Sequence, residues 1–339
     1  MNQSVTIIVD YLGFLRRNKH QSSTLDVDTI SSILARSGYE VKITSYQDIA
    51  ERVFVPRDSF IWYTSSEFPT YKTYIEDILL SLDPSNILIP SFDFLRAHNN
   101  KGFQEFVRQK YDITSLDSHY FGTLEELLCI IDNIEFPVVL KGIEGSGSQN
   151  VELCQDKYQL ISKIKKYSRC ESYFFSYAKK MLKRFVYVKK YDFENSMESL
   201  NYKNFVLQKF IPGMKNDWKV LIFNDKYYVL KRIVKRNDFR ASGSGYFVWE
   251  EVKLSLLDFC SGIREKFNVP WISLDICFFE NEYHLIEFQC VHFGPMGLNN
   301  SSFYYEQKEN NHWEKIEAKS NLISTYSEAF VKYIQANYS

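Results

Sequence analysis

Residues 271–291 read WISLDICFFENEYHLIEFQCV, and this stretch decides the fold of the second half of the chain. Two apolar segments, at 271–280 and 283–291, are rich in β-branched and aromatic residues and predict two strands. Between them lies Asn281-Glu282, a polar pair that favours a tight turn. The stretch therefore predicts an antiparallel β-hairpin.

Three polar residues interrupt the apolar pattern of this hairpin: Asp275, Glu287 and Gln289. Glu287 and Gln289 are two positions apart and therefore share a face. A turn centred on 281–282 sets Asp275 opposite position 288, and a one-residue bulge or shift brings it to the face of Glu287. Two carboxylates and an amide oxygen are ligands that suit Mg²⁺, and carboxylates in such apolar strands are costly to bury without a cation. The alternative is an acidic pair at an exposed edge.

Cationic residues recur through residues 205–245, FVLQKFIPGMKNDWKVLIFNDKYYVLKRIVKRNDFRASGSG. The segment predicts strands at 205–211, 218–224 and 226–234, the last two joined by a turn at 224–225. It ends with Arg240 before a loop of small residues, an arrangement suited to gripping a phosphate and closing over it. Taken alone, the same residues could form a solvated basic strand face.

A second glycine-rich turn follows Lys141. The strand FPVVLKG at 136–142 delivers this lysine, and EGSGSQN at 144–150 follows with Ser146 at its centre. Glycines let backbone N–H groups approach phosphate oxygens closely, and lysine adds a positive charge. The simpler alternative is a β-hairpin with a glycine turn.

The N-terminal part of the chain alternates strands with helices, which predicts a parallel α/β sheet. The C-terminal half instead runs from strand to strand, which predicts an antiparallel α+β arrangement. The remaining predicted strands lie at 5–10, 41–46, 60–65, 86–90 and 151–154, and the helices at 26–37, 71–82, 99–110, 123–132, 156–168, 255–267 and 317–337.

Composition narrows the functional classes. The formal net charge is −1, so no bulk electric field favours nucleic acid or an anionic membrane. No stretch of 18 apolar residues predicts a transmembrane helix, and the N-terminal apolar run is too short for a signal peptide and is broken by Asp10. We therefore expect a cytoplasmic protein; the sequence leaves its oligomeric state open, a homodimer included.

In their order along residues 90–300, these features resemble the ATP-grasp ligases, in particular the branch of glutathione synthetase and the ribosomal-protein glutamate ligases. The resemblance implies an ATP-grasp fold with an N-terminal α/β pre-ATP-grasp domain at 1–95. It further implies linker helices and a small lid subdomain at 96–205, and a C-terminal subdomain at 206–339 with an antiparallel sheet and a metal site.

The resemblance also implies roles for individual residues. Lys219 stands where the family has the arginine of an Asp-x-Arg motif, and Gln289 where it has asparagine; lysine keeps the charge but loses the bidentate fork. The implied ATP-binding residues are Lys101, Lys141, Ser146, the hinge Gln208-Lys209-Phe210-Ile211, whose backbone at Lys209 and Ile211 would read the adenine, and Asp217. The implied catalytic residues are Lys219, Arg232 and Arg240, and the implied metal ligands are Asp275, Glu287 and Gln289.

The implied activity is ATP-dependent ligation of a carboxylate to an amine through an acyl phosphate, with ATP and two Mg²⁺ (or Mn²⁺) ions as cofactors. The implied substrates are small-molecule or peptide carboxylates and amines, whose identity the sequence does not reveal. Two alternatives stay open: an ATP-grasp kinase or carboxylase, and a nucleotide-binding regulatory protein without ligase activity. The N-terminal domain, residues 292–305 and residues 170–204 are the candidate substrate-reading segments.

Overall fold

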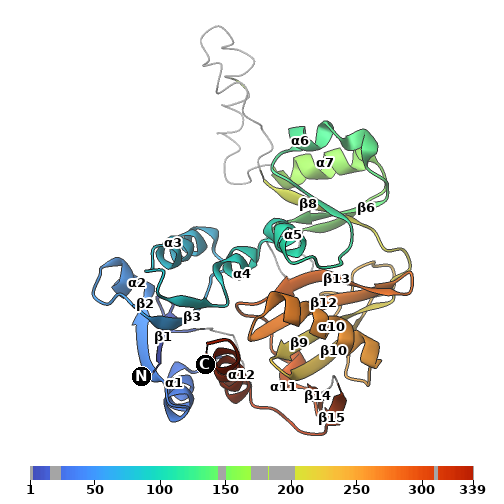
Figure 1. The fold of residues 1–339 in the computed structure, drawn as a ribbon. Helices are drawn as coiled ribbons and strands as arrows, with labels where there is room; N and C mark the ends of the chain where they lie inside the picture. Colours follow the sequence, from blue (N-terminus) through green and yellow to red (C-terminus); the bar gives the residue numbers. More distant parts are fainter. Residues whose placement is uncertain are drawn as a thin grey trace. The chain divides into compact units, whose positions relative to one another are not determined.

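The computed structural model describes residues 3–15, 24–143, 150–168, 182, 203–308 and 312–338. The chain forms two compact units. The first consists of Met1–Asn99, Phe106–Ser115 and Gly213–Ser339, and the second of Asn100–Glu105 and Leu116–Pro212. The strands form three separate sheets, two in the first unit and one in the second (Figure 1).

The N-terminal sheet of the first unit is parallel, with the order β2-β1-β3-β4, as the alternation of strands and helices predicted. Strands β1, β3 and β4 are largely apolar, as is usual for strands covered on both faces, whereas the edge strand β2 is largely polar and mostly exposed. The strands are β1 (Ser4–Val9), β2 (Glu40–Ser45), β3 (Ser59–Tyr63) and β4 (Ile87–Ile89), and the helices are α1 (Val27–Arg36), α2 (Tyr46–Ala50), α3 (Pro69–Leu80) and α4 (Phe92–Ala97).

The second sheet has seven strands in the order β13-β12-β9-β10-β14-β15, with β11 paired to β10, and all its pairs are antiparallel. This confirms the α+β character of the C-terminal half. The strands are β9 (Asn216–Phe223), β10 (Lys226–Ile233), β11 (Phe247–Val248), β12 (Trp271–Phe279), β13 (Glu282–Gln289), β14 (Tyr304–Gln307) and β15 (Trp313–Ile316), and the helices are α10 (Leu254–Phe267) and α11 (Met296–Asn299).

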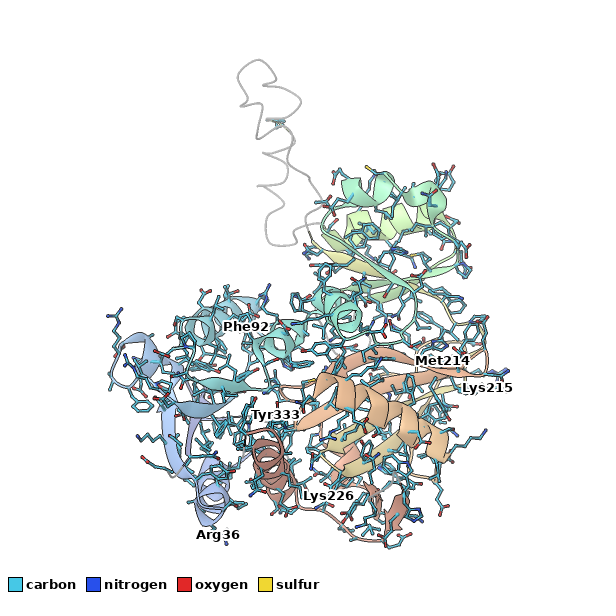
Figure 2. The ribbon with its side chains drawn as sticks, in the orientation of Figure 1. Arg36, Phe92, Met214, Lys215, Lys226 and Tyr333 are labelled. Atoms are coloured by element: carbon cyan, nitrogen blue, oxygen red, sulfur yellow. The ribbon has the colours of Figure 1, made fainter. Side chains whose placement is uncertain are left out.

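The C-terminal helix α12 (Leu322–Tyr338) joins these two sheets. Its residues Tyr326 and Phe330 share one hydrophobic core with Trp62 of β3 and Trp271 of β12, whose rings lie 4.9 Å apart. Side chains of α12, among them the labelled Tyr333, fill the space beside both sheets (Figure 2). This large aromatic core explains why the two sheets belong to one compact unit.

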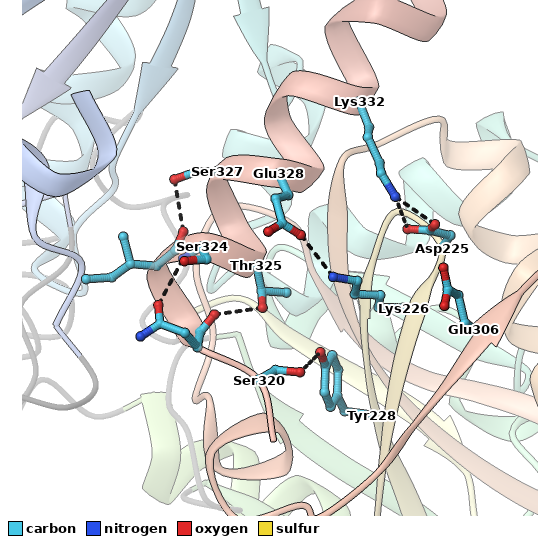
Figure 3. Close-up of polar contacts among 12 residues, drawn as sticks. Asp225, Lys226, Tyr228, Glu306, Ser320, Ser324, Thr325, Ser327, Glu328 and Lys332 are labelled. Carbon is cyan, nitrogen blue, oxygen red and sulfur yellow. Dashed lines mark hydrogen bonds and ion pairs between the residues drawn. The ribbon is translucent and has the colours of Figure 1, made fainter. Parts of the chain in front are cut away.

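Polar contacts fix the register of α12 on the hairpin of β9 and β10 (Figure 3). Glu328 pairs with Lys226 at 2.9 Å, and Lys332 pairs with Asp225 at 2.8 Å. The Tyr228 hydroxyl lies 2.6 Å from the Ser320 hydroxyl. The ion pairs are partly exposed, so they contribute orientation more than stability.

The second unit contains an antiparallel sheet with the order β5-β8-β6-β7. Leu140, Leu207 and Phe205 pack on one face of this sheet against its helices. The strands are β5 (Ser118–Phe121), β6 (Val138–Gly142), β7 (Val151–Cys154) and β8 (Phe205–Lys209), and the helices are α6 (Leu124–Leu128) and α7 (Lys157–Ser168). Helix α5 (Lys101–Lys110) begins in this unit and ends in the first.

Two helices have bounds that differ by several residues from those predicted. The helix predicted at 123–132 ends at Leu128, and a 3₁₀ turn follows at Ile131–Asn133. The helix predicted at 317–337 begins at Leu322, because Trp313–Ile316 forms strand β15 just before it. In the described parts of the chain, no helix combines the length and the apolar character needed to cross a membrane.

Candidate functional site

The predicted polar residues of the C-terminal half gather on one face of the seven-stranded sheet. In this sheet β9 lies between β10 and β12, and β13 forms the edge. Asp217 is paired with Arg232, Lys219 with Asp275, and Asp275 with Glu287. Because directly paired residues and residues two apart point to the same side, these five side chains share a face.

An ionic network joins four of these residues. Arg232 forms a bidentate pair with Asp217, with Nε–Oδ1 and Nη2–Oδ2 distances of 2.7 and 2.6 Å. Arg232 Nη2 also lies 2.9 Å from Asp275 Oδ2, and Lys219 Nζ lies 3.2 Å from Asp275 Oδ1. Two cations thus balance two anions, which is the condition for keeping charges buried at tolerable cost.

The side chains of this network are mostly buried. The Arg232 and Asp217 side chains are 7% and 4% exposed, and Asp275 is 14% exposed. Burial raises the pKa of the Asp275 carboxyl, but Arg232 and Lys219 outweigh burial and hold that pKa at about 2. Burial likewise acts to lower the pKa of Arg232, yet its two carboxylate partners hold it above the usual value. Both residues are therefore charged at neutral pH.

The hairpin of β12 and β13 has the geometry that brings Asp275 beside Glu287. Its turn residues are Glu280 and Asn281, both in the left-handed region with φ of 51° and 64°, one position earlier than the sequence indicated. The register shifts between Asp275 and Ile276, so that a β-bulge aligns Asp275 with Glu287. The predicted one-residue shift is thus present.

A buried arginine supports this bulge. Ile286 has no partner in the register of β12 and β13. Its carbonyl accepts a hydrogen bond from Arg108 Nη2 at 2.6 Å, and Arg108 is buried. A guanidinium thereby satisfies a backbone acceptor next to the bulge. Sequence reasoning missed Arg108, because nothing in its helix indicates a partner so far along the chain.

The proposed metal ligands fit a divalent cation in part. Among the described residues, no group of three or more His, Cys, Asp and Glu side chains is arranged to hold a metal ion. The carboxylates that the register brings together are Asp275 and Glu287, and Gln289 lies two residues beyond Glu287 on the same face. Both oxygens of Asp275 accept from cations, but each carboxylate oxygen has two lone pairs, so each keeps a lone pair that could bind a metal ion. Two carboxylates and an amide oxygen remain a donor set suited to Mg²⁺.

Arg240 is held locally. Its Nε and Nη2 lie 2.9 and 3.0 Å from Oδ1 and Oδ2 of Asp238, and the Arg240 side chain is 37% exposed. This hydrogen-bonded pairing lowers the pKa of Asp238 to about 2. Gly243 and Gly245, in the loop that follows, have positive φ, which glycine tolerates without strain. Asp238 was not identified from the sequence, although it lies only two positions away.

In the second unit, Lys141 contacts the predicted hinge strand. Its Nζ donates to Gln208 Oε1 at 2.6 Å, and both residues are buried. Val139 is the direct partner of Gln208 across β6 and β8, so Lys141 and Gln208 are diagonal neighbours on one face. Lys101, also buried, begins α5 and its backbone N–H donates to the Ile143 carbonyl at 3.2 Å.

The other residues of this unit that were predicted to bind ATP are Lys209, Phe210, Ile211 and Ser146. Strand β8 ends at Lys209, whose backbone N–H donates to the Asp117 carbonyl at 2.8 Å. That N–H is engaged in the sheet, so the adenine-reading role given to the Lys209 backbone would rest on its carbonyl. Phe210 is half-buried and Ile211 is buried. Ser146 lies outside the described residues, as does most of 170–204.

The structure thus brings Asp217, Lys219, Arg232 and Asp275 into one network within the first unit. Glu287 and Gln289 share its sheet face, while Arg240 is paired with Asp238 in a separate loop. The structure also joins Lys141 and Gln208 within the second unit.

Known proteins resemble this chain in fold and not in sequence. No protein-family model matches the sequence, and no curated protein sequence matches it. Solved structures do match. D-cycloserine synthetase DcsG aligns with a TM-score of 0.55 and 8% identity over 97% of this chain and 99% of its own. The ADP complex of N5-carboxyaminoimidazole ribonucleotide synthetase aligns with a TM-score of 0.52 and 10% identity over 100% and 98%.

A third match is the ATP-grasp ligase PsnB, complexed with a precursor peptide and AMPPNP. It aligns with a TM-score of 0.51 and 11% identity over 98% of both chains. At this level of identity, the matches establish the fold alone. They confirm the fold that the order of motifs predicted.

Proposed function

We propose that this chain, which has the ATP-grasp fold, is an ATP-dependent ligase that joins a carboxylate to an amine. The reaction would proceed through an acyl phosphate and release ADP and phosphate. The observation that carries the proposal is the neutral network of Asp217, Arg232, Asp275 and Lys219, which adjoins Glu287 on a single sheet face.

The network would hold the reacting phosphate oxygens in place. Lys219 is 19% exposed and Arg232 is almost fully buried, so Lys219 is the cation better placed to reach a ligand. Arg232, bound by two carboxylates, would act as a rigid positioning residue, because its side chain is already fixed before substrate arrives. Such preorganised charges stabilise a transition state without reorganising.

Glu287 is the unbalanced charge of this face. Within the part of the chain that the structure describes, it has no ion pair or side-chain hydrogen bond, and it is half-buried. With Gln289 and the free lone pairs of Asp275, it would hold Mg²⁺ or Mn²⁺. A divalent cation bound there supplies charge neutralisation for nucleotide phosphates.

The second unit holds residues of its own that would bind nucleotide. Lys141, whose Nζ donates to Gln208, is a buried ammonium that would donate to a phosphate oxygen. Arg240 could exchange Asp238 for a phosphate, since both side chains are partly exposed and the loop after Arg240 contains two glycines with positive φ. The pairing keeps Arg240 oriented until then.

The test is ADP formation with a panel of amino acids and peptides as carboxylates, each with and without amine acceptors. ADP release that requires both partners supports the ligase. Release with a single phosphorylated product would indicate a kinase, and release that requires bicarbonate a carboxylase. Nucleotide binding without any turnover across the panel would favour a regulatory protein.

One substitution tests the site itself. Glu287→Gln keeps the side-chain shape and removes one charge, so folding should survive while ADP formation falls by about a hundredfold or more. Glu282→Gln, at the exposed start of the same strand, is the matched control and should retain wild-type rates. Near wild-type ADP formation by Glu287→Gln at saturating Mg²⁺ would remove the proposed metal site.

A further inference from the structure

The N-terminal parallel sheet contains a topological switch point. In the order β2-β1-β3-β4, the chain runs from β1 to β2 on one side and places β3 on the other side of β1 (Figure 1). Ligands of open α/β sheets bind outside the carboxyl ends of the strands at such a point. The residues that leave β1 and β3 are therefore the ones to inspect.

Asp10 and Ser65 follow the carboxyl ends of the neighbouring strands β1 and β3. β1 and β3 pair in parallel from Ser4 with Ser59 to Ile8 with Tyr63, a constant offset of 55 positions. Asp10 and Ser65 each lie two residues beyond the last pair, so both follow the carboxyl ends of the two strands. Neighbouring strands lie about 4.8 Å apart, so the two side chains flank the switch point.

Asp10 offers an uncompensated carboxylate there. Its Oδ1 accepts the backbone N–H groups of Leu12 and Phe14, both at 2.9 Å, and the residue is half-buried. Over the ranges that the structure describes, no cation pairs with it. A half-buried carboxylate with a free oxygen and no cation is a ready acceptor for a positively charged ligand.

Tyrosines surround this carboxylate. The Tyr71 ring lies 5.3 Å from Tyr11 and 6.5 Å from Tyr46, in both cases nearly perpendicular, and it stacks on Tyr74 at 5.7 Å. Burial raises the pKa of Tyr46 and Tyr71, and the nearby charge of Asp10 adds to both shifts. Their hydroxyls therefore stay protonated beside Asp10. Aromatic rings around a carboxylate favour an organic cation.

Ser65 supplies a further polar atom. The residue is 8% exposed, and its Oγ has no hydrogen-bond partner. The Tyr46 hydroxyl donates to the neighbouring Thr64 carbonyl at 2.6 Å, which ties this end of β3 to the tyrosine cluster. A buried hydroxyl without a partner costs free energy unless a ligand completes it.

We propose that Asp10, Ser65 and Tyr71 form a binding site for the primary ammonium group of the amine substrate. An ammonium has three donors, and the site offers three acceptors: the free oxygen of Asp10, the Ser65 hydroxyl and the second lone pair of the Tyr71 hydroxyl. The exposed ring of Tyr11 would line the entrance. That the ligand is the amine substrate rests on the proposed ligase function; the site itself does not.

Direct binding tests the site without turnover. The probes are the α-amides of the seventeen amino acids other than proline, aspartate and glutamate, each with a primary ammonium and no carboxylate, titrated into the full chain by calorimetry. We expect at least one amide to bind, and its N-acetyl derivative, which has no ammonium, not to bind. Failure of all seventeen at millimolar concentration, or equal binding of the N-acetyl form, would overturn the proposal.

Two variants locate the binding. Asp10→Asn keeps the oxygen that accepts from Leu12 and Phe14, so it should fold, yet amide affinity should fall about tenfold or more. Ser65→Ala removes a hydroxyl without a partner, so the melting temperature should hold or rise while affinity falls. Asp28→Asn, on the exposed face of α1, is the control and should bind normally.

The same variants separate this site from the proposed function. Asp10→Asn should bind ATP as the wild type does, because the residue is absent from the proposed nucleotide site. Wild-type amide affinity in Asp10→Asn contradicts the ammonium site and leaves the ligase proposal intact. Amide binding in a chain that forms no ADP on any substrate leaves the ammonium site intact and contradicts the ligase.

Discussion

Replacement of Arg232 by methionine is the sharpest test of the network in the first unit. The guanidinium makes three contacts of 2.6–2.9 Å with Asp217 and Asp275. Methionine fills much of the same volume but leaves two buried carboxylates with Lys219 as the remaining cation. Breaking a buried ion pair by removing one partner costs roughly 3–5 kcal/mol, because the remaining charge is buried without compensation. We expect a loss of unfolding free energy in that range.

The measurement is urea unfolding at pH 7, followed by tryptophan fluorescence and circular dichroism. Lys231→Met is the matched control: Lys231 is the preceding residue of β10, points to the opposite face and pairs with Glu250, which is 46% exposed. An exposed pair contributes about 0–1 kcal/mol. Arg232→Lys should fall between the two, since it keeps the charge but loses the bidentate geometry.

The reasoning fails if Arg232→Met costs no more than Lys231→Met. It also fails if the two variants respond alike to acid. With Arg232 gone, the carboxylates of Asp217 and Asp275 become easier to protonate, which relieves their repulsion. The difference in stability between Arg232→Met and wild type should therefore shrink as the pH falls below about 5.

Three further results are expected. The pKa of Asp275 lies at about 2, below the ordinary 3.8, so its contribution of roughly 2 kcal/mol is present above pH 4 and is lost as the pH falls toward 2; Asp275→Asn should abolish this pH dependence of the unfolding free energy. Gly102→Ala should destabilise the second unit in thermal unfolding, because an added Cβ would lie 2.3 Å from the Tyr120 ring; unchanged melting would contradict this packing. Lys141→Ala should weaken ATP binding in calorimetry by roughly 1.5–3 kcal/mol, while exposed Lys166→Ala should not change it.

The sequence predicted the regular elements wherever hydrophobic periodicity was strong. The parallel sheet, the hairpins and the helices at 101–110 and 254–267 all lie within a few residues of their predicted positions. Strands β5, β14 and β15 were not predicted, whereas β7, which has the same length of four residues, was. Segments so short carry too little periodicity for consistent prediction, and they are strands because distant partners supply the hydrogen bonds.

The turn of the β12–β13 hairpin could be predicted only in part from its local sequence. Asparagine tolerates positive φ, so Asn281 correctly marked the turn. Glu280 also adopts positive φ, which its side chain does not favour and which its sequence position does not reveal. A turn at Glu280 and Asn281 alone would set Asp275 opposite Ile286, and the bulge between Asp275 and Ile276 aligns Asp275 with Glu287 instead. The predicted neighbours meet because of the bulge.

The ion pairs of the site were harder to predict from the sequence than the residues that form them. Lys219 meets Asp275 because β9 lies beside β12, although the two residues are 56 positions apart in sequence. Strand order within an antiparallel sheet depends on packing of the whole chain, and no local pattern encodes it. The sequence therefore identified both residues as functional candidates and assigned them to separate roles, without their mutual contact.

That contact divides the predicted metal ligands into two kinds. Asp275 is already neutralised by Arg232 and Lys219, so its removal should act first on stability. Glu287 follows it on the same face and is balanced by no cation among the residues that the structure describes. A divalent cation would be drawn to the excess negative charge at Glu287, with Asp275 completing the site through its spare lone pairs. Glu287→Gln should therefore raise the Mg²⁺ concentration needed for half-maximal ADP formation while leaving the urea midpoint nearly unchanged. Asp275→Asn should shift both, and an effect of Glu287→Gln on stability alone would contradict this division of roles.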